Sequence, residues 1–229
     1  MSINLHMLPP SVNNLAVRLF LRAPGLPFAE ENVWGKTRSP DFMAKIPAHL
    51  TLAIEHADHP RGAMWERCAI MMYIANPHHL DALYPSDPGK RALVDSANFY
   101  LTGTLYPLLA RSTYPRLGFP SYPGEVAAAE DATAEQKAVA RTASEAALAE
   151  PLEVFRTCFV RDGFIGDGAS PSIADIRFAA TLEFIALNDT PLPAWAAAYL
   201  GRVVAALGTA YSEPAADVRG FVASVKKSA

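Results

Sequence analysis

The sequence predicts a small α/β domain followed by an all-helical domain, and three observations lead to this prediction. Before residue 77, short apolar runs alternate with turn residues in the order strand, helix, strand, hairpin and helix. Residues 76–88 then carry three prolines, and each disfavours helix in the residue before it. From Gly89 onward, apolar residues recur at helical spacing without a strand pattern. We therefore expect domains at residues 1–77 and 89–229, joined by a linker at 78–88.

The elements of the first domain follow from apolar runs and the turns between them. We expect, in order, a strand at 3–8, a helix at 15–23, a strand at 28–34, a short helix after Ser39-Pro40, a strand at 51–55, a strand ending near Trp65 after a turn at 60–62, and a helix at 66–75.

The second domain reads as a series of helices. Apolar positions from Leu93 to Leu108 predict the first helix, and Pro107 predicts a kink in it. Residues 113–131 contain three prolines and two glycines and predict a long surface loop. Further helices are expected at 133–150 and 152–160 with a break at Pro151, then from Ser172, at 193–207 and at 217–226.

Composition excludes several classes of protein. The net charge of −3 argues against a nucleic-acid binder, and no apolar run approaches the roughly 20 residues that span a bilayer. The N-terminus lacks a basic region followed by an apolar stretch, so we expect no export signal. Two cysteines, Cys68 and Cys158, suit a reducing cytosol, and the six histidines show no paired metal spacing. We therefore expect a cytoplasmic protein that binds neither membrane nor metal.

The most informative stretch of the chain is residues 163–178. Ser172 precedes Asp175 by three residues just before an apolar run, which is the pattern of a capping box at a helix start. With the preceding Gly-Asp, the segment Ser-Ile-Ala-Asp-Ile closely resembles the start of the buried helix in cytosolic glutathione transferases (GSTs). Residues 83–92, 103–106 and 193–202 also resemble this family, and the first two segments are closest to its insect-type serine enzymes.

The resemblance covers most of the chain and carries several expectations. It implies an N-terminal thioredoxin-like domain, a C-terminal α-helical GST domain and a homodimer. It also implies glutathione as co-substrate and a small electrophile as second substrate. Fold membership alone does not establish activity, so the site residues must be considered one by one.

Ser11 and Asn13 are the candidate catalytic residues. The resemblance places Ser11 where serine-type members hold their catalytic hydroxyl, and Asn13 where some bacterial members have an asparagine that contacts sulfur. Such a donor would stabilise the thiolate of glutathione, which is the attacking species. In the alternative interpretation, both are local caps of a strand-to-helix turn, a role that favours Ser and Asn.

His49, Thr51 and Leu52 fall in the segment that reaches glutathione in serine-type members. His49 resembles the histidine at the glycine end of the tripeptide, although it could equally be a solvated loop side chain. Leu52 takes the position of the family's cis-proline, with Pro47 as the less favoured candidate. Because a cis bond before a residue other than proline costs about 2.5 to 4 kcal/mol, we expect the Thr51–Leu52 bond to be trans.

Glu66 and Arg67 resemble the Glu-Ser pair that holds the γ-glutamyl group. Glu66 is retained, but Arg67 replaces the hydroxyl residue. An arginine could form a bidentate pair with a carboxylate, block the pocket, pair with Glu66 or point into solvent. Cys68 is expected to be a core thiol.

Tyr106, Leu109, Arg111 and Tyr114 match the positions that line the electrophile site in this family. Each could instead be a core residue at helical spacing. The loop around residues 119–122 could cover this pocket as a lid.

The sequence therefore predicts a GST-like enzyme that activates a thiol, most simply glutathione, for attack on a small electrophile. The replacements at Leu52 and Arg67 suggest a specialised variant, such as a biosynthetic or sulfur-transfer enzyme. The alternative is a non-catalytic ligand- or protein-binding module that has lost glutathione binding.

Overall fold

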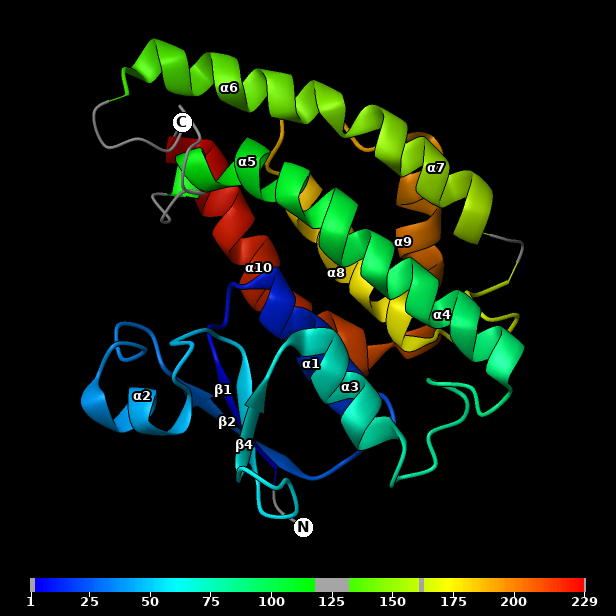
Figure 1. The fold of residues 1–229 in the computed structure, drawn as a ribbon. Helices are drawn as coiled ribbons and strands as arrows, with labels where there is room; N and C mark the ends of the chain where they lie inside the picture. Colours follow the sequence, from blue (N-terminus) through cyan, green and yellow to red (C-terminus); the bar gives the residue numbers. More distant parts are fainter. Residues whose placement is uncertain (1–2, 118–131, 161–162, 229) are drawn as a thin grey trace.

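The structure is a computed structural model that describes residues 3–117, 132–160 and 163–228 (Figure 1). Its elements in chain order are β1 (Ile3–Met7), α1 (Val12–Arg22), β2 (Phe28–Asn32), α2 (Pro40–Lys45), β3 (Ala53–His56), β4 (Ala63–Trp65), α3 (Arg67–Ala75), α4 (Pro88–Tyr100), the π-helical turn η1 (Leu101–Leu105), α5 (Tyr106–Leu117), α6 (Ala134–Ala147), α7 (Ala149–Phe159), α8 (Ile173–Ile185), α9 (Ala194–Leu207) and α10 (Thr209–Ser228).

The N-terminal elements form a four-stranded sheet in the order β2-β1-β3-β4. β1 and β2 are parallel, whereas β1–β3 and β3–β4 are antiparallel, with Leu5 of β1 opposite Glu30 of β2 and Ile54 of β3. Helices α1 and α3 pack on one face of this sheet, and α2 lies beyond its other face (Figure 1). The sheet followed by helices confirms the predicted fold class.

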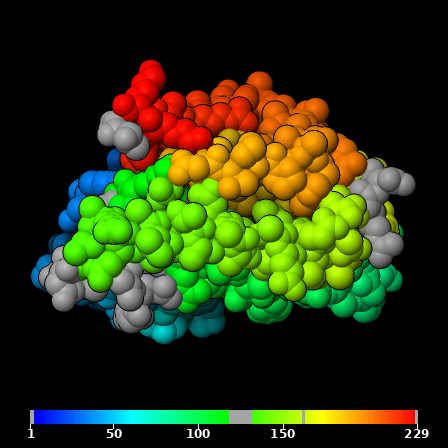
Figure 2. All heavy atoms as spheres, turned by 90° about the horizontal axis from the view of Figure 1, so that it is seen from above, coloured from blue at the N-terminus to red at the C-terminus, as the bar shows by residue number. Residues whose placement is uncertain are grey.

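Helix α8 forms the centre of the helical domain, since all thirteen of its residues are buried. It packs against α1, α4, α5, α9 and α10. Helices α6 and α7 run along the outer side of α4 and α5, as Figure 1 and the view from above in Figure 2 both show. Because α8 contacts α1, one continuous apolar core extends from the sheet into the helical domain.

The predicted capping box at the start of α8 is present. The Ser172 hydroxyl accepts from the backbone N–H groups of Ala174 and Asp175, and the Asp175 carboxylate accepts from the Ser172 N–H at 2.8 Å. Asp175 also accepts from the Tyr199 hydroxyl of α9, so the same carboxylate joins α8 to the next helix. The motif therefore has a tertiary role that its local pattern does not reveal.

The irregularity predicted at Pro107 lies one turn earlier. The helix widens into η1, where the N–H of Tyr106 donates to the carbonyl of Leu101. Proline has no N–H to donate and its ring crowds the carbonyl four residues before it, so a wider turn before Pro107 accommodates both effects.

The loop predicted at residues 113–131 begins later than expected, because α5 continues through Pro115 to Leu117. The possible lid at residues 119–122 lies outside the described residues.

Two further helix boundaries differ from the prediction. The break predicted at Pro151 falls at Leu148, and Pro151 lies in the first turn of α7, where a backbone N–H has no helical partner. The final helix begins at Thr209 and not at residue 217. Its buried stripe, which consists of Tyr211, Ala215, Val218 and Val222, continues across Pro214 at helical spacing.

No helix within residues 3–117, 132–160 and 163–228 combines the length and apolar character needed to cross a membrane. The position of the domain boundary stays a prediction; α3 ends at Ala75 and α4 begins at Pro88.

Candidate functional site

A cavity of about 380 Å³ opens where the sheet domain meets the helical domain. Its wall includes the start of α1, the loop before β3, the turn before α3, and the region from η1 to α5. The lining residues are Asn13, Leu50, Thr51, Leu52, Glu66, Arg67, Thr102, Tyr106 and Tyr114. Seven of the eleven residues predicted from the sequence are among them.

Asn13 and two tyrosines form a connected set of polar groups at this cavity. The side-chain amide of Asn13 donates to the Tyr106 hydroxyl at 2.6 Å, and that oxygen is hydrogen-bonded to the Tyr114 hydroxyl. An amide nitrogen carries two hydrogens, so Asn13 can serve Tyr106 and a ligand at the same time. When Tyr114 donates to Tyr106, the Tyr106 hydroxyl can donate to a ligand as well. The set is therefore suited to stabilise an anionic sulfur.

Ser11 lies apart from the larger cavity. It occupies the N-cap position of α1, but its side chain makes no capping hydrogen bond; its hydroxyl accepts from the side-chain amide of Asn14 at 2.7 Å. Asn14 in turn accepts from the backbone N–H of Leu8 and so ties the end of β1 to α1. Ser11 and Leu109 line a smaller space of about 30 Å³ beside Tyr106 and Tyr114. Ser11 therefore stands at the N-cap of α1, but its side chain does not cap the backbone of the helix.

The Thr51–Leu52 peptide bond is cis, so the expected trans bond is wrong. The expectation rested on the intrinsic preference of an isolated bond. In the folded chain, the Leu52 side chain is buried in the main core and the next residue, Ala53, is paired with both β1 and β4. Both Thr51 and Leu52 line the cavity.

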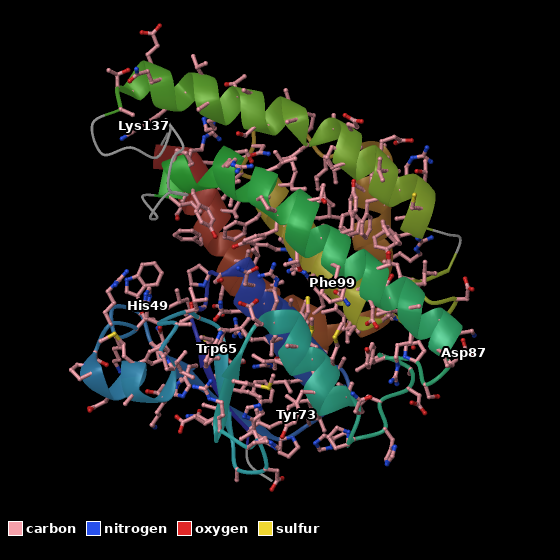
Figure 3. The ribbon with its side chains drawn as sticks, in the orientation of Figure 1. His49, Trp65, Tyr73, Asp87, Phe99 and Lys137 are labelled. Carbon is pink, nitrogen blue, oxygen red and sulfur yellow. The ribbon has the colours of Figure 1, made fainter. Side chains whose placement is uncertain are left out.

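Glu66 and His49 reach the site region from loops. Glu66 precedes α3 with a φ of 75°, a conformation that is uncommon for residues other than glycine, and its side chain lines the cavity. His49 has a φ of 44° and lies on the loop at the edge of the sheet domain that faces the helical domain (Figure 3), but it is not among the lining residues. The carboxylate of Glu66 is thus placed to receive a cationic group, whereas the role of His49 stays a prediction.

Arg67 is buried, which contradicts the solvent-facing alternative. Its guanidinium carbon lies 4.5 Å from the centre of the Tyr106 ring, and no ion pair joins it to Glu66 among the described residues. Such a cation–π contact contributes about 0.5 to 2 kcal/mol. A second buried arginine, Arg177 of α8, lies 5.8 Å from the same ring. Burial, and then repulsion by Arg67, lowers the pKa of Arg177 to about 9.

Sequence reasoning did not identify Asn14, Leu50, Thr102 and Arg177. A signal for Arg177 was present, because an arginine inside the otherwise apolar run of a buried helix requires a special environment. Arg111, a predicted substrate residue, does not line the larger cavity. Cys68 is only partly buried; its sulfur lies 3.7 Å from the Asn98 side-chain oxygen.

The described part of the chain contains no group of three or more His, Cys, Asp or Glu side chains that could hold a metal ion. The cavity instead combines neutral donors, one carboxylate and one guanidinium. This arrangement suits a zwitterionic ligand whose nucleophile is stabilised by hydrogen bonds.

Comparison with known proteins provides relatives for this geometry. No protein-family model matches the chain. Glutathione S-transferase 1 of Manduca sexta is 30% identical over 109 residues, a match that covers 47% of this chain and 49% of the moth protein. The chain thus spans about half the length of this curated relative.

Two solved structures share the fold over nearly their whole length. A delta-class glutathione transferase of Nilaparvata lugens has a TM-score of 0.77 at 24% identity, covering 99% of this chain and 100% of the insect chain. A glutathione transferase homolog from Drosophila mojavensis, solved with bound glutathione, has a TM-score of 0.74 at 25% identity, covering 99% and 97%.

Proposed function

We propose that this chain, which shares the fold of the cytosolic glutathione transferases and is related in sequence to insect members of that family, transfers glutathione to small electrophiles. The observation that carries the proposal is the cavity between the two domains. There, Asn13, the cis Thr51–Leu52 segment and Glu66 come together from three separate parts of the sheet domain.

The polar set around Asn13 supports activation of the thiol. A thiolate is the reactive form of glutathione, and donors aimed at the sulfur favour it over the thiol. Asn13 and Tyr106 are neutral donors at the cavity wall, so each can form a hydrogen bond to the sulfur anion. Between the two predicted residues, Asn13 is the better placed, because Asn13 lines the larger cavity and Ser11 lies outside it.

The remaining residues of the sheet domain support binding of the tripeptide. The carboxylate of Glu66 can accept hydrogen bonds from the γ-glutamyl ammonium group. Thr51 and Leu52 line the cavity, and we infer that their backbone polar groups pair with the cysteinyl part of the ligand. His49 lies at the domain edge and remains our candidate for the glycine end.

In the transfer step, the thiolate attacks the electrophile, a carbon–sulfur bond forms and the leaving group departs with its electron pair. The proton lost from the thiol passes to water. Tyr106 and Tyr114 border both cavities, so they are placed to contact the electrophile as well.

Two features favour a second candidate, a non-catalytic binding protein. Arg67 stands where the resemblance implies a hydroxyl, and Ser11 does not line the larger cavity. Such a protein would fold and pair without transferring glutathione. A homodimer in the cytosol, as the resemblance implies, is compatible with both candidates.

Isothermal titration of reduced glutathione into the wild type, Glu66→Ala and Glu153→Ala tests the donor site. We expect wild-type binding in the micromolar to millimolar range, loss in Glu66→Ala, and no change in Glu153→Ala, which alters an exposed carboxylate on α7. Absence of wild-type heat, with the protein shown to be folded by circular dichroism, would favour the binding-protein candidate.

Turnover of 1-chloro-2,4-dinitrobenzene with glutathione then tests the catalytic residues. We expect Asn13→Ala to lower kcat/KM on the order of 100-fold, because it removes a donor to the developing thiolate. The acidic limb of the kcat/KM profile should shift to higher pH, since the thiol is harder to ionise. Ser11→Ala should have the smaller effect; the reverse order would contradict our choice of Asn13.

A further inference from the structure

Two buried arginines from different domains meet at one aromatic ring beside the cavity. Arg67, at the start of α3, is 9% exposed, and Arg177, within α8, is 1% exposed. Their guanidinium carbons lie 4.5 Å and 5.8 Å from the centre of the Tyr106 ring. Arg67 and Tyr106 both line the cavity, so the positive charge reaches its wall.

These two cations lack the partners that buried charges normally have. No carboxylate among the described residues forms an ion pair with either side chain. The Nε and Nη2 atoms of Arg67 and the Nε atom of Arg177 are buried and have no hydrogen-bond partner within the described part of the chain. Arg177 donates from Nη2 to the Thr102 hydroxyl at 3.4 Å. A ring face attracts a cation but leaves these N–H groups unsatisfied, so the site is short of an anion.

The position of the arginine pair favours the electrophile over glutathione as the source of that anion. Tyr106 and Thr102, which contact the two guanidinium groups, belong to η1 and α5 of the helical domain. Glu66, Thr51 and Leu52, which are proposed to hold the peptide part of glutathione, come from the sheet domain, whereas Tyr106 is a proposed donor to its sulfur. An anion bound by Arg67 at the Tyr106 ring therefore lies beside the proposed position of the reacting sulfur, where the electrophile has to bind.

We propose that Arg67, supported by Arg177, binds a carboxylate carried by the electrophile, so that the enzyme prefers acidic acceptors. This inference rests on the proposed function and adds the class of its second substrate. An arginine fork matches the two oxygens of a carboxylate, and the neutral donors Thr102 and Tyr106 are adjacent. The lowered pKa of Arg177 agrees with a site that is incomplete without its anion.

Binding is tested without turnover by titrating the unreactive 3,5-dinitrobenzoate and its neutral counterpart 3,5-dinitrobenzamide into the protein, in the absence of glutathione. We expect the acid to bind wild type roughly tenfold more tightly than the amide. Arg67→Met should remove this preference, Arg67→Lys should retain part of it, and Arg156→Met on α7 should leave it unchanged. If Arg177→Met does not fold, the Arg67 variants still decide the question.

Turnover is tested with 4-chloro-3,5-dinitrobenzoate and the matching benzamide as acceptors for glutathione. In both, the thiolate forms a bond to the ring carbon, chloride leaves with the bonding pair, and the thiol proton passes to water. We expect kcat/KM to favour the acid in wild type and the preference to disappear in Arg67→Met, mainly through KM.

The outcomes separate this inference from the proposed function. Equal binding of acid and amide, with glutathione still bound and transferred, overturns the carboxylate site alone. Loss of glutathione binding in Arg67→Met with unchanged dinitrobenzoate binding also overturns it, because the anion would then belong to glutathione. Preference for the acid without any glutathione binding in wild type supports the carboxylate site and contradicts the transferase.

Discussion

At the scale of single residues, Asp175 connects the start of α8 to its surroundings. Its carboxylate accepts hydrogen bonds from the backbone N–H groups of Ile165 and Ser172, from the Ser172 hydroxyl and from the Tyr199 hydroxyl. Burial raises the pKa of Asp175, and the hydrogen bonds from Ser172 and Tyr199 oppose that rise. Removal of this one side chain leaves several buried donors without an acceptor.

We expect Asp175→Ala to destabilise the protein by about 3 kcal/mol or more, since each unsatisfied buried donor costs about 1 to 3 kcal/mol. Ser172→Ala removes one capping acceptor and should cost about 1 kcal/mol. Urea unfolding followed by circular dichroism measures both. Equal losses for the two variants would show that the long-range bonds to Asp175 contribute little.

The same residues show what the sequence can predict of a site. The bond between Ser172 and Asp175 spans three residues, so its pattern is visible in the sequence. Tyr199 is 24 positions away, and its bond to Asp175 depends on how α8 and α9 pack. Arg67 and Arg177 likewise come together only through the packing of α3 on α8. No short-range pattern in the sequence predicts that these two side chains share one aromatic ring.

At the scale of elements, the carboxylate of Asp189 ties together three helices. It follows α8 and pairs with Arg116 of α5 at 2.6 Å and with Arg141 of α6 at 2.9 Å. Hydrogen bonds from these two arginines lower the pKa of Asp189 from 3.8 to about 2. The folded state therefore binds the proton less readily than the unfolded state. The resulting stabilisation is complete above pH 4 and is lost as the pH falls toward 2.

We expect Asp189→Asn to lower the free energy of unfolding near neutral pH by up to about 1 kcal/mol, because its side chain is 66% exposed and solvent screens the pairs. Urea unfolding at pH 6, 4 and 3 should show the gap between wild type and variant closing at the lowest pH. Glu153→Gln, which breaks an exposed pair within one helix, serves as the control. A gap that widens toward pH 3 would contradict this assignment.

How well each element could be predicted depends on the source of its signal. Strands and amphipathic helices follow from local periodicity, and those elements were found in the right order. The break predicted at Pro151 was wrong because this proline lies in the first turn of α7, where its missing N–H has no helical partner to lose. The last helix begins before the predicted residue 217, and its buried apolar stripe continues across Pro214. The cis bond before Leu52 was missed because the prediction used only the intrinsic preference of an isolated peptide bond.

At the scale of the whole molecule, the candidate site exists only because two domains share one core. Helix α1 packs on α8 and α10, and Arg18 of α1 pairs with Glu30 of β2 and Asp217 of α10. This arrangement places the cavity-lining residues of the sheet domain, such as Asn13 and Glu66, beside Tyr106 of the helical domain. A change that loosens the α1–α8 contact should therefore alter the shape of the cavity and also lower the free energy of unfolding.

We propose that exposed apolar side chains near the cavity belong to the contact surface of the expected homodimer. Phe99 on α4, labelled in Figure 3, is 69% exposed. Leu50, which lines the cavity, is 47% exposed. Phe99 precedes Thr102 by three residues, so the two lie on the same side of the helix and close to the cavity. Large exposed aromatic side chains on a folded surface commonly mark contacts with a partner.

We expect the wild type to have twice the mass of one chain in sedimentation equilibrium and Phe99→Glu to weaken the dimer by at least about tenfold, because a desolvated charge opposes pairing. Val154→Glu alters an exposed apolar residue of α7 and should leave the dimer intact. If both variants remain dimeric with unchanged affinity, the contact lies elsewhere. If Phe99→Glu is monomeric and folded but no longer binds glutathione, the second chain supports the cavity as well as the assembly.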